Sequence, residues 1–311
     1  MRLSVSDLSP VTRPTALCSR AWARLIALLA LSLAIALPAL AREWEATPDN
    51  YRRILRQLQA GDTLTLRSGI YRYGLPIHGL RGRADQPIVI QGPAHGQPAV
   101  LIGRPGRITI SLIDSHHITL RRLIVNGKHQ PAHGVVAEGR GSGTSHITLE
   151  NLTLLHFDAA QSYNCVSTKA PAWFWVIRNL HLRGCGTGMY LGNSDGRASF
   201  VAGLIEGNLI EHTRGYNLQI KHQQPRPTDI GLPDTPQTTV LRYNIFNKDT
   251  HGSTGVRARP NVLLGHWPLS GAGQDDQYVV YGNVFYANAN ERLFQAEGNV
   301  RAFANLFINP L

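Results

Sequence analysis

The chain has 311 residues, of which 16% are charged, and its 31 lysines and arginines exceed its 20 acidic residues to give a formal charge of +11 at pH 7. This balance, without a basic low-complexity tail, predicts attraction to polyanions, and acidic polysaccharide, nucleic acid and anionic lipid all fit it. A generic basic surface is the alternative. The three cysteines are too few for a disulfide framework.

The first 41 residues are predicted to be a signal peptide. Arg20 and Arg24 lead into an apolar run over residues 25–37, and Ala39-Leu40-Ala41 then provides a small-x-small cleavage site. The run is shorter than the roughly 20 apolar residues of a membrane helix. Residues 42–311 are therefore expected to be soluble and exported to the periplasm or the extracellular space, with no membrane contact after cleavage.

Removal of this leader takes away four arginines and one aspartate, which lowers the formal charge to +8. Export favours acidic polysaccharide over nucleic acid as the partner of so basic a chain. The n-region is long and contains Asp7 and Pro10, so a later translation start and an uncleaved membrane anchor stay open as alternatives.

Residues 50–59 are predicted to form a short helix that caps the N-terminal end of the fold. Tyr51, Ile54, Leu55 and Leu58 recur at helical spacing, and Asp49 is placed to cap the first turn. Such a helix protects strand edges that would otherwise be open to association.

A ragged internal repeat runs through the rest of the chain. Its first segment in each unit is β-rich and broken near the middle: HITLRRLIVNG (117–127), HITLENLTLLHF (146–157), WVIRNLHLRG (175–184), AGLIEGNLIEHT (202–213), TVLRYNIFNKDT (239–250), YVVYGNVFYAN (278–288) and VRAFANLFINP (300–310). Its recurrent asparagines are spaced by 28, 29, 36, 39 and 22 residues: Asn151, Asn179, Asn208, Asn244, Asn283 and Asn305. We expect these asparagines to be structural, with left-handed backbone at bends and amides that bond one another along a stack.

A second strand follows each broken segment after a Gly- or Asn-containing turn: GVVAEG, NCVSTKA, GMYLGNSDG, YNLQIKHQ, GVRARP and RLFQAEG. Two or three short strands per turn of roughly 22–30 residues, with no helix between them, exclude a βαβ fold. The pattern predicts an all-β fold, a single-stranded right-handed parallel β-helix over residues 42–311, in which each coil buries its inward side chains against its neighbours.

Cys165 and Cys185 lie about one turn of this repeat apart. A disulfide between neighbouring coils and a pair of stacked, buried free thiols both fit that spacing. At the other end, the chain stops at Leu311 just after a strand-like segment, without an obvious cap. Either a partner covers this edge or the sequence is shortened relative to its relatives.

Three early segments carry a resemblance to a known family: GDTLTLRSGIYR (61–72), QPIVIQG (86–92) and HHITLRRLIVNG (116–127). Together with the capping helix, they resemble polysaccharide lyases of the chondroitinase B and alginate lyase family, within the pectate-lyase-like β-helix superfamily. The resemblance covers the first two or three coils, and the later coils resemble exported bacterial β-helix proteins. It implies the fold and an acidic polysaccharide as substrate.

Register between the second strands defines a candidate site, because alternation separates inward from outward side chains. The predicted inward set is Val166, Met189, Leu191, Leu218, Ile220, Val256, Ala258, Phe294 and Ala296. The predicted outward column is Ser167, Lys169, Tyr190, Gln219, Lys221, Arg257, Arg259, Gln295 and Glu297, with Asn193, Asp195 and His222 just past the strand ends. Coils stack about 4.8 Å apart, so these side chains are close enough to act on one sugar chain.

A lyase that acts on uronic acids must neutralise the carboxylate, remove the proton at C5 and protonate the departing glycosidic oxygen. A lysine whose pKa is lowered by cationic neighbours suits the base, and an arginine suits a bidentate carboxylate clamp. Lys221 is the predicted base and Arg257 or Arg259 the clamp or proton donor, with His222 beside them. Lys169, Tyr190, Asn193, Asn217, Gln219 and Gln295 are predicted to bind substrate. The resembled family also uses a lysine and an arginine on neighbouring coils, which implies the pair Lys221 and Arg257.

The resembled enzymes hold calcium with acidic residues just before the catalytic lysine, whereas residues 216–220 contain none. Calcium at Asn193 and Asp195 stays an alternative, although an Asn-Ser-Asp-Gly turn explains those residues without a metal. A glycoside hydrolase is disfavoured because it needs two carboxylates roughly 5–10 Å apart and outward acidic residues are sparse. The favoured function is a polysaccharide lyase or an epimerase that uses the same proton abstraction. The alternative is a non-catalytic glycan-binding protein that uses the basic column with Tyr190, Trp173 and Trp175.

Overall fold

The structure is a computed structural model that describes residues 41–139, 141–227 and 229–310. The predicted signal peptide lies outside the described residues except for Ala41, and it stays a prediction. No helix in the described part of the chain is long and apolar enough to cross a membrane.

Three parallel sheets wind around one core, and the chain visits them in the order A, B, C in each coil. Sheet A contains β1 (Glu43–Ala46), β2 (Thr63–Leu66), β5 (Ile88–Gln91), β8 (His116–Arg121), β11 (Thr144–Glu150), β15 (Val176–Arg178), β19 (Leu204–Glu206), β22 (Thr238–Arg242), β25 (Gln277–Tyr281) and β28 (Val300–Phe303), flanked by β14 (Ala172–Trp173) and β18 (Phe200–Val201).

Sheet B contains β3 (Gly69–Tyr71), β6 (Ala99–Ile102), β9 (Ile124–Asn126), β12 (Thr153–Phe157), β16 (His181–Cys185), β20 (Leu209–Glu211), β23 (Ile245–Asn247), β26 (Val284–Tyr286) and β29 (Leu306–Ile308). Sheet C contains β4 (Leu75–His78), β7 (Ile108–Ile113), β10 (His133–Ala137), β13 (Asn164–Thr168), β17 (Thr187–Leu191), β21 (Leu218–Ile220), β24 (Val262–Leu264) and β27 (Phe294–Ala296).

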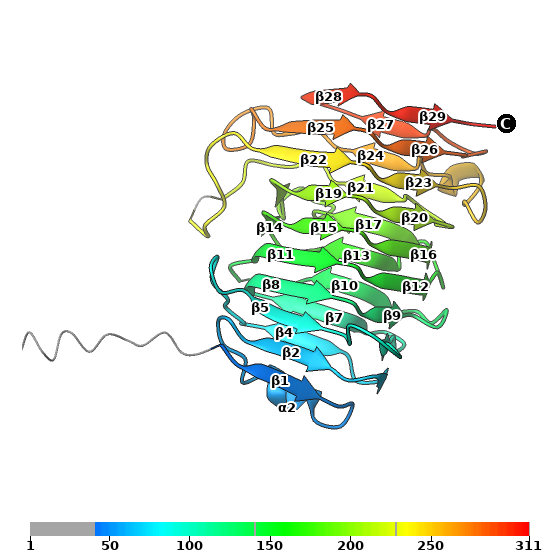
Figure 1. The fold of residues 1–311 in the computed structure, drawn as a ribbon. Helices are drawn as coiled ribbons and strands as arrows, with labels where there is room; N and C mark the ends of the chain where they lie inside the picture. The colour runs from blue at the N-terminus through cyan, green and yellow to red at the C-terminus, as the bar shows by residue number, and fades with distance from the viewer. Residues whose placement is uncertain (1–40, 140, 228, 311) are drawn as a thin grey trace, which may run out of the picture. The chain divides into compact units, whose positions relative to one another are not determined.

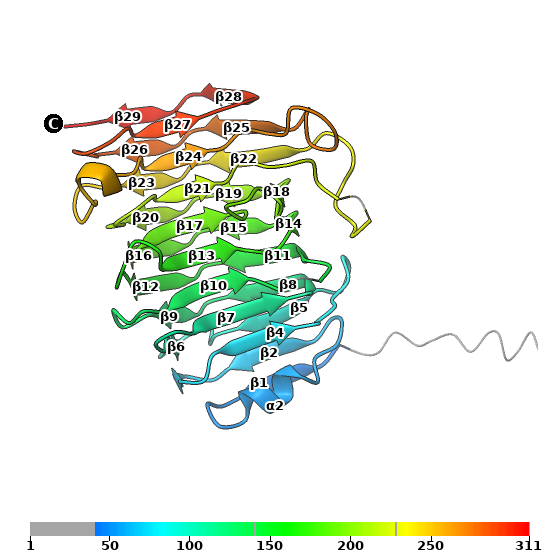
Figure 2. The same cartoon turned by 180° about the vertical axis from the view of Figure 1, so that it is seen from behind.

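Figures 1 and 2 show the coils rising from β1 to β28 and β29, with neighbouring coils paired strand to strand. The fold is the predicted right-handed parallel β-helix. Alternation places one side chain of each pair in the core: in β8, Ile118 and Leu120 are fully buried whereas Thr119 is partly exposed.

The helix α2 (Tyr51–Leu55) covers the N-terminal end beside β1, as Figure 1 shows. It is shorter than the predicted span 50–59, and the predicted cap at Asp49 is wrong. The N-cap residue is Asn50, whose side-chain oxygen accepts a hydrogen bond from the Thr47 amide (2.9 Å) and does not cap the helix. The Tyr51 hydroxyl donates to the Gly74 carbonyl (2.8 Å), which fixes the helix against the first coil.

The predicted structural role of the asparagines is confirmed, but it divides between two groups. Asn151 and Asn179 take left-handed backbone at the bend between sheets A and B, with φ of 51° and 53°. In later coils another residue takes the left-handed position, and the asparagine after it points inward. These amides form a ladder from Asn208 to Asn244 (2.8 Å), Asn283 (2.9 Å) and Asn305 (3.0 Å).

Cys165 in β13 and Cys185 at the end of β16 form a disulfide between neighbouring coils, with Cα atoms 5.7 Å apart. Both residues are fully buried. Of the two alternatives that the sequence leaves open, the structure therefore has the covalent bridge. It lies one residue before Val166, on the strand that also carries Ser167 and leads into Lys169.

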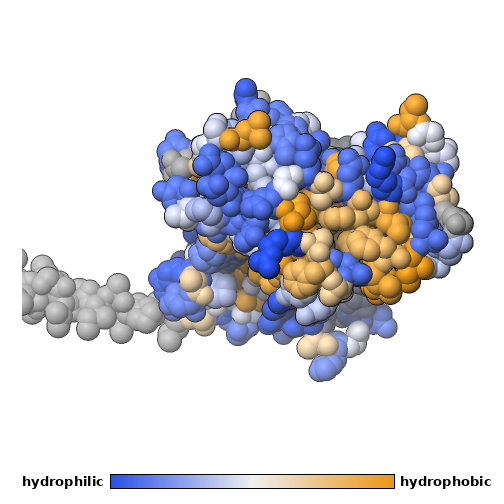
Figure 3. Space-filling view, turned by 90° about the horizontal axis from the view of Figure 1, so that it is seen from above, coloured by the Kyte–Doolittle hydropathy of each residue, from blue (hydrophilic) through white to orange (hydrophobic). Residues whose placement is uncertain are grey.

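The C-terminal end presents apolar side chains to solvent. Phe303, Leu306, Phe307 and Ile308 of the last coil are 50%, 54%, 50% and 37% exposed. Figure 3, which views this end, shows apolar side chains gathered in orange and tan within a hydrophilic border. The predicted absence of a cap thus holds within the described residues, and a partner at this end stays a prediction.

Candidate functional site

The outer face of sheet C carries two columns of side chains, defined by strand register. The strand-centre column contains Ser111, Val136, Ser167, Tyr190, Gln219, Leu263 and Gln295. The strand-end column contains Glu138, Lys169, Gly192, Lys221, Gly265 and Glu297, each of which follows the last inward residue of its strand. Both columns run along the axis of the solenoid.

A glycine makes room at the centre of the strand-end column. Gly192 lies between Lys169 and Lys221, and a Cβ atom added to it would lie 3.2 Å from the Lys221 Cβ. Tyr190 lies two residues before Gly192, in the strand-centre column. The Lys169 ammonium lies 3.7 Å from the ring centroid and the Lys221 ammonium 5.9 Å, so two cations on alternate coils flank one phenol.

Burial shifts the pKa of Lys169 and the pKa of Tyr190 in opposite directions. Burial, with a further contribution from the Lys221 charge, lowers the pKa of Lys169 to about 8. Burial raises the pKa of Tyr190, so the phenol keeps its proton at neutral pH. A partly neutral amine next to a protonated phenol is a base beside an acid.

A cavity of 370 Å³ opens over this pair. Its lining residues are Gln161, Ser162, Asn164, Lys169, Thr187, Tyr190 and Tyr216. The pKa of Tyr216 is also raised by burial, against the opposing charge of Arg259. A polar cavity with one cation, two phenols and side-chain amides suits a hydroxylated anionic ligand such as a uronate sugar.

The predicted positions of Arg257 and Arg259 are wrong. The sheet C strand of that coil is β24, whereas Val256, predicted inward, is 96% exposed in a loop. Arg257 ends the 3-10 helix η1 (Gly255–Arg257), and Pro260, which has no amide donor, separates this loop from β24. The pattern Val-Arg-Ala-Arg resembles a strand, and Asn261 was the signal for the true strand, because Asn217 stands at the same register position one coil earlier.

Arg259 does not line the cavity: its guanidinium donates to the Val256 (3.1 Å) and Ala258 (2.6 Å) carbonyl groups, and its charge acts on Tyr216. Its backbone is fixed by Lys248, whose buried ammonium donates to the carbonyl groups of Arg259 (2.7 Å) and Pro260 (3.0 Å). Burial lowers the pKa of Lys248 to about 7. Arg257 is bound to the cavity wall only through its carbonyl, which accepts from Gln161 Nε2 (3.3 Å).

Several predicted substrate-binding residues lie elsewhere. Asn217 is fully buried and its amide donates to the Ile210 and Asn247 carbonyls at 3.2 and 3.0 Å, so its predicted contact with substrate is wrong. Gln219 and Ser167 belong to the outer column but neighbouring side chains cover them. Gln295 is exposed near the C-terminal end, four strands from Ser167.

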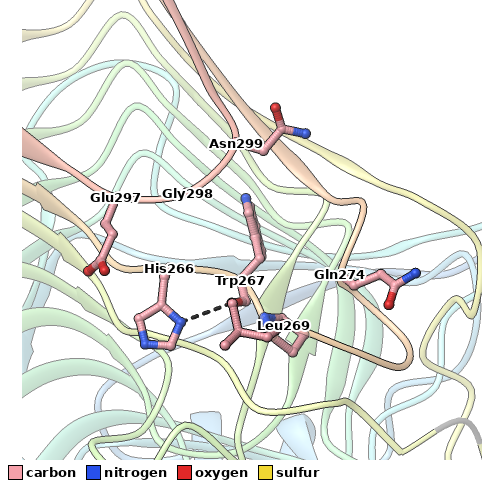
Figure 4. A pocket seen from close by; sticks show the side chains of 8 residues that line it. His266, Trp267, Leu269, Gln274, Glu297, Gly298 and Asn299 are labelled. Carbon is pink, nitrogen blue, oxygen red and sulfur yellow. Dashed lines mark hydrogen bonds between the residues drawn. The ribbon is translucent and has the colours of Figure 1, made fainter.

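His222 follows Lys221 and stacks on His266 of the next coil, with ring centroids 5.5 Å apart. Burial, with the charges of Lys221 and His266, lowers its pKa. A second cavity of 430 Å³ begins at His266 and is lined by Trp267, Leu269, Gln274, Glu297 and Asn299. Figure 4 shows the hydrogen bond from His266 to the Trp267 carbonyl (2.9 Å) at its edge.

Asn193 and Asp195 form a turn whose side-chain oxygens accept backbone amides. Asn193 Oδ1 accepts from Ser194 (2.8 Å) and Asp195 Oδ1 from Arg197 (3.0 Å). In the described residues, no three His, Cys, Asp or Glu side chains converge on a point where a metal ion would sit. This turn does not fit the oxygen cage that calcium needs.

No protein-family model and no curated protein matches the chain. Among solved structures, an alginate lyase from Paenibacillus sp. str. FPU-7 is similar with a TM-score of 0.52 and 17% identity, over 86% of this chain and 97% of that one. A pectate lyase from Bacillus sp. N165 in complex with trigalacturonate has a TM-score of 0.48 and 12% identity, over 87% and 83%. A lacto-N-biosidase from Eubacterium ramulus has a TM-score of 0.46 and 12% identity, over 94% and 70%.

These likenesses concern the fold. The chain has a parallel β-helix, a fold that it shares with the alginate lyase. The chondroitinase B part of the predicted resemblance is not among these findings and stays a prediction.

Proposed function

We propose that the protein is a polysaccharide lyase that cleaves an acidic, uronate-containing polysaccharide by β-elimination at Tyr190 and its two flanking lysines. One observation carries the proposal: a protonated phenol lies 3.7 Å from an ammonium whose pKa is lowered to about 8, with a second lysine on its other side. The location of an exported enzyme of this kind, in the periplasm or the extracellular space, is part of the proposal.

Each group has a separate role in the reaction. The Lys221 charge neutralises the uronate carboxylate, which makes the C5 proton more acidic. Neutral Lys169 removes that proton and becomes an ammonium, while the C4–O bond breaks and a C4–C5 double bond forms. The Tyr190 phenol donates its proton to the departing glycosidic oxygen, and solvent then exchanges the protons back.

This assignment moves the base from Lys221, the sequence prediction, to Lys169. The lowered pKa of Lys169 is the reason, because a base must be neutral before it reacts. Lys221, whose ammonium lies 5.9 Å from the Tyr190 centroid against 3.7 Å for Lys169, is assigned to hold the carboxylate. The predicted arginine clamp is not needed, since a lysine provides the charge.

A hydrolytic mechanism has weaker support. The acidic residues of the strand-end column are Glu138 and Glu297, which are five coil spacings apart, or about 24 Å. Glycosidases need their two carboxyl groups roughly 5–10 Å apart. Glu138 is also engaged by the Ser111 hydroxyl (2.7 Å).

The test is absorbance near 232 nm, where unsaturated uronates absorb, with protein from Arg42 onward and alginate, polygalacturonate and chondroitin sulfate as substrates, with and without EDTA. A rise with one polymer that Lys169→Ala abolishes supports the proposal. Lys128→Ala, which removes an exposed lysine from a loop after sheet B, is the matched control. A flat trace on all three polymers overturns the lyase and favours a glycan-binding protein.

A further inference from the structure

A third cavity, of 330 Å³, lies on the same face of the molecule toward its N-terminal end. Arg52 and Leu55 of α2 and its C-cap residue Arg56 line the cavity on one side, and Pro76, His78 and Leu80 line it on the other. Arg52 and Arg56 are four residues apart, so both guanidinium groups project from one side of the helix. Both arginines are exposed, and the Arg52 charge reaches His78.

Strand register places this cavity in line with the proposed reaction centre. His78 pairs with Ile113, the next coil continues the row at Glu138, and the coil after that at Lys169. His78 and Lys169 are therefore three coil spacings apart, about 14 Å, which is roughly the length of three pyranose units. A polymer that lies along the solenoid axis thus reaches from one cavity to the other.

The surface between the two cavities suits a sugar chain. Ser111 Oγ lies 2.8 Å from His78 Nε2 and donates to Glu138 Oε1 (2.7 Å), which fixes these polar groups in a row. Ile113 is partly exposed between them and offers an apolar patch to the C–H face of a pyranose ring. Glu138 accepts hydrogen bonds, so the sugar above it is expected to present a hydroxyl rather than its carboxylate.

We infer that Arg52 and Arg56 form a distal subsite that binds a carboxylate of the same polysaccharide, about three sugars from the bond that is cleaved. The identity of the ligand rests on the proposed function. Guanidinium groups bind carboxylates through paired, charge-assisted hydrogen bonds, and a pyranose edge packs against Leu80 and Pro76. The subsite makes the protein prefer polymers to short oligomers.

The experiment compares Arg52→Ala/Arg56→Ala with Arg53→Ala/Arg301→Ala in the chain from Arg42 onward. The control removes equal charge from the remaining exposed arginine of α2 and from β28 in sheet A. Affinity is measured for alginate, polygalacturonate and chondroitin sulfate and for a disaccharide of each. We expect the test variant to bind the preferred polymer about 3- to 10-fold more weakly than wild type, with a smaller difference at high salt.

The disaccharide discriminates the subsite from a general loss of charge, because two pyranose units, about 10 Å, are too short to reach from Lys169 to the arginines. Its affinity is expected to be the same in wild type, test variant and control. Equal polymer affinity in the test and control variants overturns the subsite, even if the 232 nm assay establishes the lyase. A selective loss in the test variant together with a flat 232 nm trace supports the subsite and overturns only the catalytic proposal. Failure of the wild type to bind any polymer overturns both.

Discussion

The ammonium of Lys169 lies over the face of the Tyr190 ring, 3.7 Å from its centroid, although the two residues belong to strands of neighbouring coils. Strand register places Lys169 beside Gly192, a residue without a side chain, two positions after Tyr190. The contact brings a base and an acid within reach of one glycosidic bond.

The substitution Tyr190→Phe, which removes only the hydroxyl oxygen, tests the role of Tyr190 as the proton donor. In Tyr190→Phe the ring and its contacts with both lysines remain, but the proton donor is lost. We expect kcat to fall by about 100-fold or more with little change in KM. Tyr216→Phe is the matched control, because Tyr216 lines the same cavity without a cation over its ring, and it is expected to keep most of the activity. An equal loss in both variants would contradict the role of Tyr190.

The dependence of kcat/KM on pH tests the role of Lys169 as the base. Neutral Lys169 is the reactive form, so the rate is expected to rise with pH and to level off above about 8. The Lys221 charge contributes to the lowered pKa, so Lys221→Met is expected to raise the pKa of Lys169 and move the rise to higher pH. The measurement is kcat/KM against pH for both proteins. If the midpoint of the pH profile is the same in both proteins, the Lys221 charge does not lower the pKa of Lys169, which contradicts this prediction.

The asparagine ladder is expected to stabilise the later coils. Asn244→Leu places an apolar side chain where Leu152 and Leu180 stand in earlier coils, but it removes the acceptor of both the backbone and the side-chain amide of Asn208. We expect unfolding to become easier by about 2–4 kcal/mol, measured by denaturant titration. Asn151→Gly, at an exposed left-handed position, is the control and should change stability by less than about 0.5 kcal/mol.

The disulfide should also stabilise the fold. Cys165 and Cys185 are 20 residues apart, and a bridge of that length is worth about 3 kcal/mol. Cys165→Ala/Cys185→Ala is expected to lower the melting temperature of the non-reduced protein, and a reducing agent should lower that of wild type but not of the variant. A wild type that does not respond to reductant would show that the bridge does not form in solution.

Local sequence patterns predict much of the arrangement of side chains on the outer face of sheet C. The alternation in NCVSTK, GMYLG and NLQIK predicts correctly which side chains leave the core, and hence that Lys169, Tyr190 and Lys221 share one face. The assignment of GVRARP fails because a strand and an exposed loop have the same alternation here, and the structure distinguishes them by the burial of Val262 and Leu264.

The distinction between the two lysines was beyond the sequence for another reason. Both follow an inward residue at the end of a sheet C strand, so pattern alone makes them equivalent. They differ in the distance from each ammonium to the Tyr190 centroid, 3.7 Å for Lys169 and 5.9 Å for Lys221, which depends on the side chains of neighbouring coils. The cavity residues Gln161, Thr187 and Tyr216 were missed because they belong to turns and strand starts, where spacing gives no register.

The most direct test is the 232 nm assay of Lys169→Arg and Lys221→Arg side by side on the polymer that wild type cleaves. An arginine keeps the positive charge but does not lose its proton at the pH of the assay, so it replaces a carboxylate clamp and not a base. The account predicts that Lys169→Arg loses activity by about 100-fold or more whereas Lys221→Arg stays within about 10-fold of wild type. The opposite order would make Lys221 the base and contradict the assignment.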